Sequence, residues 1–511
     1  MKETEWAREE AKVFGPIYTE CVSEYTLPDY LPDIRKVLSV KGQLMPIAPF
    51  LSDEQAEWGG SCVFSVLYTS PEGKAAALSI PVEYRFALPF GDKGEEEIKF
   101  FEHSKIEQIS CRLTGPRKLQ AKAAVVSRPK WWQEKEQKGA RQEDNLVLLK
   151  KEWEFESTFP FHFQCKPIAA TLPLTGKDLQ LLSSEGCVFI RELTKEKDKV
   201  TAKGEVRVEA ILAGEDGIPF TLGTKVNFEE VLPPEVNESS LCLGQITAME
   251  VELREEEEAA EVIFDMEICL FGESKVKEMR SLVRDAFSLN YPTEVKMGEI
   301  ELSHRVAQQS RFFTLEGRVD RVGDVAKEPL TVANTSCLFD TPTCSLSGQK
   351  LVAETVAHIT MLLLAEGGEE GTTLLSHSFD YPVKMEIDLA APPPKDTVWE
   401  GILTAAPAHG RLDQSKLFFD IEVCLTVLGS ISEHCTTVEQ VDIEKISPFE
   451  KERHSIVAVY LTEGDSLWSI AKHYHANPGE IAEQNGLGEE VLENLDKPYA
   501  LDGYIRLLIT T

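Results

Sequence analysis

The sequence predicts a multidomain chain of mainly β repeated units, followed by a small domain of strand–helix–helix–strand order. Two observations support this fold class. Amphipathic strand patterns recur along the chain before residue 455, and the end of the chain instead combines short apolar strands with helix-capping signals. A length of 511 residues accommodates about three or four domains at roughly 100–200 residues each.

The clearest strand pattern lies near the middle of the chain. Val200–Leu212 alternates apolar and polar residues, Gly214–Gly217 supplies a turn, and Phe220–Phe228 begins a second strand. Alternation of this kind, interrupted by a glycine-rich turn, is typical of a β-hairpin with one buried face.

Similar pieces recur at intervals. Phe264–Leu270 reads Phe-Asp-Met-Glu-Ile-Cys-Leu, and Phe419–Leu425 reads Phe-Asp-Ile-Glu-Val-Cys-Leu. A hairpin pattern precedes each, at Val206–Phe228 and Val356–Tyr381, and a third copy covers Val63–Phe86. Three copies of a unit of about 150 residues fit the length of the chain. Chance similarity between amphipathic strands is the alternative.

These repeats set the expected boundaries along the chain. We expect a first unit at 1–150 with a helical linker at its end, a second at 151–295, a third at 296–445, a linker at 446–454 and the C-terminal domain at 455–511. The segment 128–144 is rich in charged helix formers and is interpreted as an exposed helix or linker. Within it, the pair Trp131 and Trp132 is expected to be a packing anchor.

Composition excludes several kinds of partner. The chain is 42% apolar and 27% charged, which is ordinary for a soluble protein, and its net charge is −33. So acidic a surface repels nucleic acid backbones and anionic lipids, and its simplest role is solubility. We expect no nucleic-acid partner and no direct membrane insertion, because no stretch is apolar enough to span a bilayer and the N-terminus lacks a signal-peptide core.

The cysteines favour a reducing compartment. There are eleven, an odd number, and no two of them form a CxxC pair. This pattern indicates reduced and mostly buried thiols in a cytoplasm, and it argues against a disulfide framework or a zinc site.

The C-terminal domain begins with a strand at Ile456–Leu461 and a turn at Glu463–Gly464. Asp465 is expected to cap a helix that buries one apolar side. The residues of that side are Leu467, Trp468, Ile470, Ala471 and Tyr474.

A second helix is expected to begin at Asn477, with Pro478 at its first position and Glu480 reaching back as in a capping box. The pair Asn485-Gly486 ends this helix, and Tyr504–Ile509 forms the closing strand.

This segment resembles the LysM family. The run Gly464–Ala471, Gly-Asp-Ser-Leu-Trp-Ser-Ile-Ala, matches the family's first-turn signature, and later marker positions are occupied by Tyr474, Ile481, Asn485 and Leu487. The resemblance implies two antiparallel strands packed on two helices. It also implies a shallow groove between two loops that binds chains containing N-acetylglucosamine, without a cofactor.

The resemblance assigns residues of this sequence, position by position, to the two loops that form the sides of the groove. The first loop supplies Gly464, Asp465, Ser466 and Leu467, and the second supplies Asp496, Tyr499 and Asp502. The second loop is longer than usual, and Asp502 stands where the family has a proline. Trp468 and Tyr474 are expected in the core and not at the sugar.

The charge of this domain leaves two kinds of ligand open. Its acidic residues outnumber its basic ones, and peptidoglycan peptides also carry carboxylates. The ligand is therefore either a peptidoglycan chain or a protein.

Two other segments resemble the SPOCS domain of spore-coat assembly proteins from endospore-forming bacteria. They are Glu24–Val40, which contains Leu-Pro-Asp-Tyr-Leu-Pro-Asp, and Asp285–Tyr291, which resembles a linker between copies of that domain. Repeated units followed by LysM imply a spore-coat morphogenetic protein on the mother-cell side of the forespore surface, in the cytoplasm. Its implied partners are the ATPase scaffold of the coat's basement layer and other coat proteins. The simplest role of the prolines and aspartates at 28–33 is turn formation.

Catalytic signatures are missing from the sequence. It contains no GxxxxGK[ST], GxGxxG, HExxH or GxSxG motif. His454, His473 and His475 are close in sequence, but a solvated helix end explains them better than a metal site. We therefore expect no catalytic residue, metal or cofactor. The alternatives to a coat scaffold are a wall-binding protein and a peptidoglycan hydrolase, and the hydrolase lacks a recognisable Cys/His pair or carboxylate context.

Overall fold

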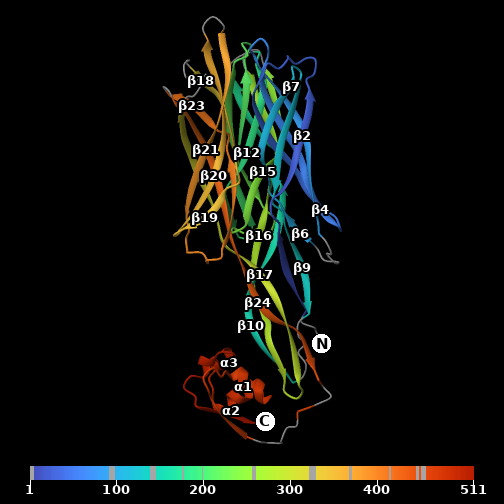
Figure 1. The fold of residues 1–511 in the computed structure, drawn as a ribbon, viewed down its shortest axis with the longest axis vertical. Coiled ribbons are helices and arrows are strands. Elements are labelled where there is room, and N and C mark those ends of the chain that lie inside the picture. Colours follow the sequence, from blue (N-terminus) through green and yellow to red (C-terminus); the bar gives the residue numbers. More distant parts are fainter. Residues whose placement is uncertain are drawn as a thin grey trace.

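The computed structural model describes residues 5–90, 98–138, 145–174, 178–197, 199–255, 260–320, 330–367, 371–413, 416–444, 448–449 and 456–510. A tall body of antiparallel sheets stands above a small C-terminal domain that contains helices (Figure 1). This arrangement confirms the predicted fold class.

The body contains three stretches, here called unit 1 (5–138), unit 2 (146–288) and unit 3 (293–443). Unit 1 contains β1 (Glu5–Val13), β2 (Ile17–Thr26), β3 (Lys36–Leu51), β4 (Gln55–Thr69), β5 (Ala75–Pro89), β6 (Ile98–Phe101), β7 (Ser104–Gly115), β8 (Lys118–Ser127) and β9 (Lys130–Lys138). Unit 2 contains β10 (Leu146–Gln164), β11 (Ile168–Leu174), β12 (Gln180–Glu196), β13 (Lys199–Ala213), β14 (Pro219–Val231), β15 (Leu241–Glu255) and β16 (Ala260–Ser288). Unit 3 contains β17 (Thr293–Asp320), β18 (Leu330–Phe339), β19 (Thr343–Ser347), β20 (Lys350–Gly367), β21 (Gly371–Asp388), β22 (Val398–Ala405), β23 (His409–Asp413) and β24 (Lys416–Ile443).

Each unit pairs its strands in the same order. One sheet is built around the first strand of the hairpin that the sequence predicts: β4 lies between β3 and β5, β13 between β12 and β14, and β20 pairs with β18, β19 and β21. The other sheet is built around the last strands of the unit. Thus β16 pairs with β10, β11 and β15, and β24 pairs with β17, β22 and β23. In unit 1 this second sheet is split into β2-β8-β7 and β1-β9-β6.

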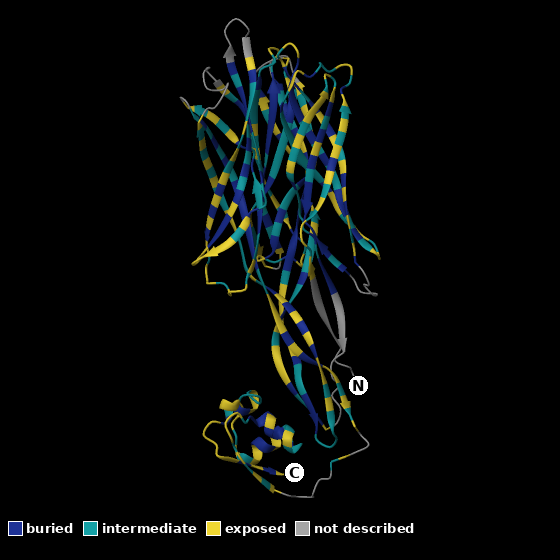
Figure 2. Ribbon diagram, in the orientation of Figure 1, coloured by how far each residue is buried: buried dark blue, intermediate teal, exposed yellow. Residues whose placement is uncertain are grey.

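The matching segments Phe264–Leu270 and Phe419–Leu425 occupy equivalent places in β16 and β24. In each, alternate residues are buried between the two sheets of the unit, as the pleat of a strand requires. Figure 2 shows that the strands of the body carry many buried residues along their length.

A bulge occurs at the same point of each unit, where the strand before the central hairpin strand shifts its register. The extra residues are Leu38 against β4, Leu182 against β13 and Ala333 against β20. All three are buried in one apolar cluster that draws residues from every unit. The units also contact one another in a ring, because β5 touches β12, β14 touches β18, and β21 touches β3. The body is therefore an approximate three-fold ring within a single chain.

The segment 128–144 does not form the exposed helix or linker that its composition favours. Lys130–Lys138 is strand β9, paired with β1 and β6, and residues 139–144 lie outside the described part. Adjacent residues of a strand point to opposite faces, so Trp131 enters the core of unit 1 and Trp132 enters a cluster shared with units 2 and 3. Burial of both rings overrides the helix propensity of the charged residues, and the predicted packing anchor is present.

The Leu-Pro-Asp segment that follows β2 in unit 1 is held by one arginine. Arg117 donates to the carbonyl oxygens of Pro28 at 2.8 Å and Leu31 at 3.2 Å, and it pairs with the Asp33 carboxylate at 2.5 Å. These contacts are structural, as turn formation predicts. Among the described residues, no helix has the length and apolarity needed to cross a bilayer.

Candidate ligand-binding site

The C-terminal domain contains more helical turns than its sequence predicts. Its elements are β25 (Ile456–Tyr460), α1 (Leu467–Tyr474), α2 (Pro478–Asn485), α3 (Glu489–Glu493), the 3-10 turn η2 (Pro498–Leu501) and β26 (Arg506–Thr510), and β25 pairs antiparallel with β26. The expected strand–helix–helix–strand order is present, with α3 and η2 added between α2 and β26. No side chain caps either addition, and Pro498 at the first position of η2 is a weak start signal by itself.

The first groove loop is organised around the start of α1. Ser466, not Asp465, is the N-cap: its Oγ accepts from the Ser469 backbone N–H at 3.1 Å, and Ser469 Oγ accepts from the Ser466 backbone N–H at 2.9 Å. Asp465 instead accepts from the backbone N–H and the hydroxyl of Thr462, at 2.7 and 2.8 Å. The sequence could not separate two adjacent residues that are both good caps.

The four residues predicted on this loop therefore play different roles. Ser466 and Leu467 are buried and hold the fold. Gly464 is exposed with φ +95°, a left-handed backbone conformation that favours glycine, and a Cβ there would meet open space. The exposed backbone at Gly464 and the partly exposed Asp465 are what this loop can offer to a ligand.

The second groove loop reaches the first through the backbone. The Trp468 N–H donates to the Leu495 carbonyl at 2.8 Å and joins the start of α1 to the loop that carries Asp496. Tyr499 is 58% exposed, and its hydroxyl donates to Asn494 Oδ1 at 3.1 Å. Leu501 anchors this loop in the core of the domain, and Asp502 is exposed. Thr462 and Leu495, which shape the two loops, were missed because only tertiary contacts reveal them.

Asp496 lies on the side of the second groove loop that contacts the body, with its side chain 30% exposed. Its carboxylate lies 3.5 Å from the Arg284 guanidinium of unit 2 and 3.6 Å from the Lys497 ammonium. The second groove loop therefore contacts the body at Asp496, whereas Gly464, Tyr499 and Asp502 are exposed.

The helices of the domain confirm several capping predictions. Asn477 caps α2 by accepting from the Gly479 N–H at 2.9 Å, Pro478 is the first helical residue, and Gly486 ends the helix in a left-handed conformation. The reciprocal capping box expected around Glu480 occurs at α1 instead. Trp468 is buried, as predicted, and Tyr474 packs against the same core without full burial.

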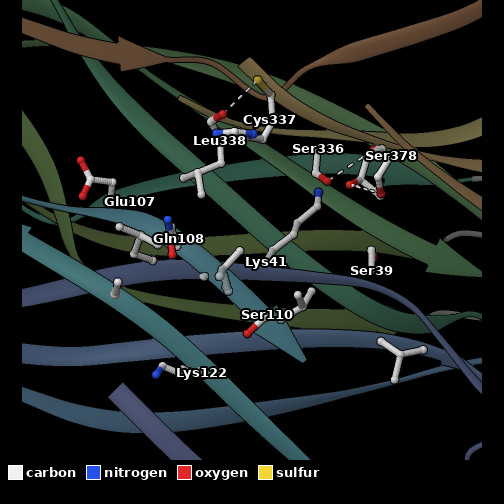
Figure 3. Close-up of a pocket in the computed structure, with 18 of the residues that line it drawn as sticks. Ser39, Lys41, Glu107, Gln108, Ser110, Lys122, Ser336, Cys337, Leu338 and Ser378 are labelled. Carbon is white, nitrogen blue, oxygen red and sulfur yellow. Dashed lines mark hydrogen bonds between the residues drawn. The ribbon is translucent and has the colours of Figure 1, made fainter. Parts of the chain in front are cut away.

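A second candidate site is a cavity of about 660 Å³ in the body, where units 1 and 3 meet. Figure 3 shows Lys41 and Ser39 of unit 1 and Ser336 and Ser378 of unit 3 facing this space. The Lys41 ammonium pairs with Glu185 of unit 2 at 2.5 Å. The lining is hydroxyl-rich and contains charges of both signs.

The described lining of this cavity does not assemble a nucleophile with a base. His358 is engaged at both ring nitrogens, with Asp380 at 2.7 Å and Asp340 at 3.0 Å. Burial alone lowers the pKa of His358, but the hydrogen bonds to these two carboxylates outweigh it and raise the pKa. Burial raises the pKa of the Cys337 thiol, which keeps it protonated and weakly nucleophilic.

The histidines near the C-terminal domain do not form a described metal centre. His475 stacks on Phe449 with ring centroids 3.7 Å apart, His473 packs edge-on against Tyr474, and His454 lies outside the described residues. No group of three His, Cys, Asp or Glu side chains that could hold a metal ion occurs in the described ranges.

Comparison with known proteins identifies the C-terminal domain. Residues 461–493 match the LysM domain family. No curated protein and no solved structure matches the chain. The match includes the first groove loop and ends before Asp496, Tyr499 and Asp502. The chain therefore carries a LysM domain at residues 461–493, a domain type whose presence implies binding of peptidoglycan chains.

Proposed function

We propose that the protein is a non-enzymatic adaptor. Its large β body serves as a scaffold, and its LysM domain attaches it to peptidoglycan or to a coat protein. The observation that carries this proposal is a LysM domain with exposed residues on both groove loops, on a body whose cavity of about 660 Å³ lacks a paired nucleophile and base among its described lining residues. Binding and scaffolding need no such pair, whereas a peptidoglycan hydrolase does.

The finer proposal is a spore-coat morphogenetic role at the forespore surface, on the mother-cell side and in the cytoplasm. It is supported by the SPOCS-like segments Glu24–Val40 and Asp285–Tyr291, and by three units that share one strand order. In this role the LysM domain binds either peptidoglycan or a coat protein such as the basement-layer ATPase scaffold, and the body presents surfaces to other coat proteins. Direct binding to peptidoglycan of the wall or cortex is the alternative function.

Reversing the charge of Asp502 should distinguish a protein ligand from a peptidoglycan ligand. Reversal of an exposed charge alters folding by less than about 0.5 kcal/mol, so Asp502→Lys tests the surface and not the fold. A basic protein ligand should lose affinity, and this loss should shrink at high salt because screening weakens surface charge pairing. A glycan ligand should be unaffected or bound more tightly.

The experiment compares the full chain, Asp502→Lys and the control Asp265→Lys, which reverses an exposed charge on unit 2. Each protein is sedimented with purified peptidoglycan sacculi and, separately, tested for capture of the basement-layer ATPase. Binding to either ligand supports attachment, and the response of Asp502→Lys assigns the ligand class. An absence of binding to both, or release of muropeptides above a heat-treated control, would overturn the adaptor proposal.

A further inference from the structure

The lower end of unit 2 contacts the LysM domain through a carboxylate. The Asp285 side chain, on β16, accepts a hydrogen bond from Trp468 Nε1 at 2.9 Å. Both of its oxygens lie 2.7 Å from the Lys472 ammonium. Trp468 and Lys472 are four residues apart, on one face of α1. A single carboxylate thus holds two side chains of the helix that begins at the first groove loop.

Apolar contacts surround this carboxylate. The Phe287 ring packs edge-on against Trp468, with centroids 5.1 Å apart and planes at 66°. Leu149 of β10 and Phe287 of β16 belong to the same buried cluster as Leu467 and Trp468. Two side chains of the body therefore complete the core of the LysM domain, and Figure 1 shows α1 beside the lower ends of β10 and β16.

Two further contacts lie on either side of Asp285. Arg284 pairs with Asp496 on the second groove loop at 3.5 Å. The Phe449 N–H donates to the Asn290 carbonyl at 2.9 Å, and its ring stacks on His475 at the end of α1. The domain is thus in contact with the body at the second groove loop and along α1, and with the linker residue Phe449 at the end of α1.

We propose that Arg284–Phe287 is a docking site that holds the LysM domain in one orientation on the body, with Asp285 as its positioning residue. This gives a structural role to the Asp285–Tyr291 segment that the sequence singles out. In the docked state Arg284 contacts the second groove loop at Asp496, while Gly464, Tyr499 and Asp502 remain exposed. That consequence for ligand presentation rests on the proposed function, whereas the docking itself does not.

The test uses the full chain and needs no ligand. Phe449 is held by the Asn290 carbonyl and by the His475 ring in the docked state, so trypsin cleavage after Lys451, two residues later, should require release of this contact. The cleavage rate then reports undocking when cleavage is slow compared with reclosing. Loss of a charge-assisted contact should raise the cleavage rate of Asp285→Ala by about tenfold or more. Asp285→Asn should have a smaller effect, because its amide oxygen still accepts from the indole N–H. Asp265→Ala, an exposed site higher on β16, should cleave like the parent.

A double-mutant cycle separates docking from a general loss of folding. Lys472→Ala should also raise the cleavage rate, and the double variant Asp285→Ala/Lys472→Ala should cleave little faster than Asp285→Ala alone, because the two residues form one contact. Amide exchange of the body strands should be unchanged in every variant. Parental cleavage of Asp285→Ala, or multiplicative effects in the double variant, would overturn the proposal.

A ligand arm keeps this proposal distinct from the proposed function. Binding of a soluble N-acetylglucosamine oligomer to the parent and to Asp285→Asn is compared under the same conditions. If the parent binds neither sacculi nor the ATPase while Asp285→Ala still undocks, the proposed function fails and the docking site stands. If the parent binds its ligands but Asp285→Ala is cleaved at the parental rate, the docking proposal is wrong and the proposed function stands.

Discussion

Trp468 should be the most sensitive residue of the LysM domain. Its side chain is 5% exposed, it packs edge-on against Phe287, and its indole N–H bonds to Asp285. Truncation of a buried tryptophan to alanine costs about 3–5 kcal/mol, and the aromatic pair with Phe287 contributes about 0.5–1.5 kcal/mol beyond its buried area. We therefore expect Trp468→Ala to lower the free energy of local unfolding around α1 by about 4 kcal/mol.

A loss of this size is most of the stability that a small domain has, which is often near 5 kcal/mol. A chain of several domains need not unfold in one step, so a global melting curve is the wrong measurement. Hydrogen exchange followed by mass spectrometry reports opening of α1 separately from the body. The control is Tyr460→Ala, whose side chain is 67% exposed and should change local stability by less than about 0.5 kcal/mol.

The expected outcome is rapid exchange of peptides covering 461–495 in Trp468→Ala, with exchange of β13 and β20 unchanged. Sacculus binding, if present in the parent, should be lost with the fold. If Trp468→Ala keeps the amide protection of α1, the ring is not a core residue and the burial argument is wrong. If protection is also lost throughout the body, the LysM domain and the body unfold as one unit, and the prediction of local unfolding around α1 is wrong.

Three further predictions concern other sites. Burial, reinforced by Glu185, raises the pKa of Glu209 to about 7, so its stabilising contribution is complete below its unfolded pKa and is lost as pH rises through about 7. Glu209→Gln should therefore be more stable than the parent at pH 8, by about 3 kcal/mol, with a smaller gain at pH 5. Equal shifts in thermal unfolding at both pH values would contradict this. Glu422 bridges two arginines of unit 2 at 2.7–2.8 Å. Glu422→Gln should therefore lower the free energy of unfolding, measured by thermal unfolding, by about 1 kcal/mol after solvent screening. The control Glu267→Gln, at the exposed equivalent position of unit 2, should leave it unchanged. Ser466→Ala removes the N-cap of α1 and should lower its protection against exchange by about 1 kcal/mol, and unchanged exchange would show that the cap is dispensable.

Local signals in the sequence predicted the parts of the fold that depend on neighbouring residues. Asn477 and Gly486 bound α2 as expected, because capping contacts span only a few residues. The same reasoning erred at Asp465, since the choice of Ser466 depends on Ser469 being able to reciprocate. It erred again at 130–138, where helix propensity is weaker than the burial of two tryptophan rings on opposite faces of a strand.

The candidate site also has one part that the sequence predicted and one part that it did not. The motif at Gly464–Ala471 identified the first groove loop, and it lies within the residues that match the LysM family. The second loop carries an added helix and a 3-10 turn, and its Asp496 faces Arg284. No local pattern indicates such a contact, because Arg284 and Asp496 are separated by 212 residues.

By itself the sequence determined the strand periodicity, the recurrence of the hairpin pattern and the LysM signature, since each depends on residues close together in the chain. Only the tertiary structure decided that the bulge residues Leu38, Leu182 and Ala333 meet in one cluster and that Asp285 bonds to Trp468, 183 residues away. The physical reason is that a strand pattern specifies which face must be buried and not what buries it. That choice is made when the units close into a ring and the end of β16 completes the core of the last domain.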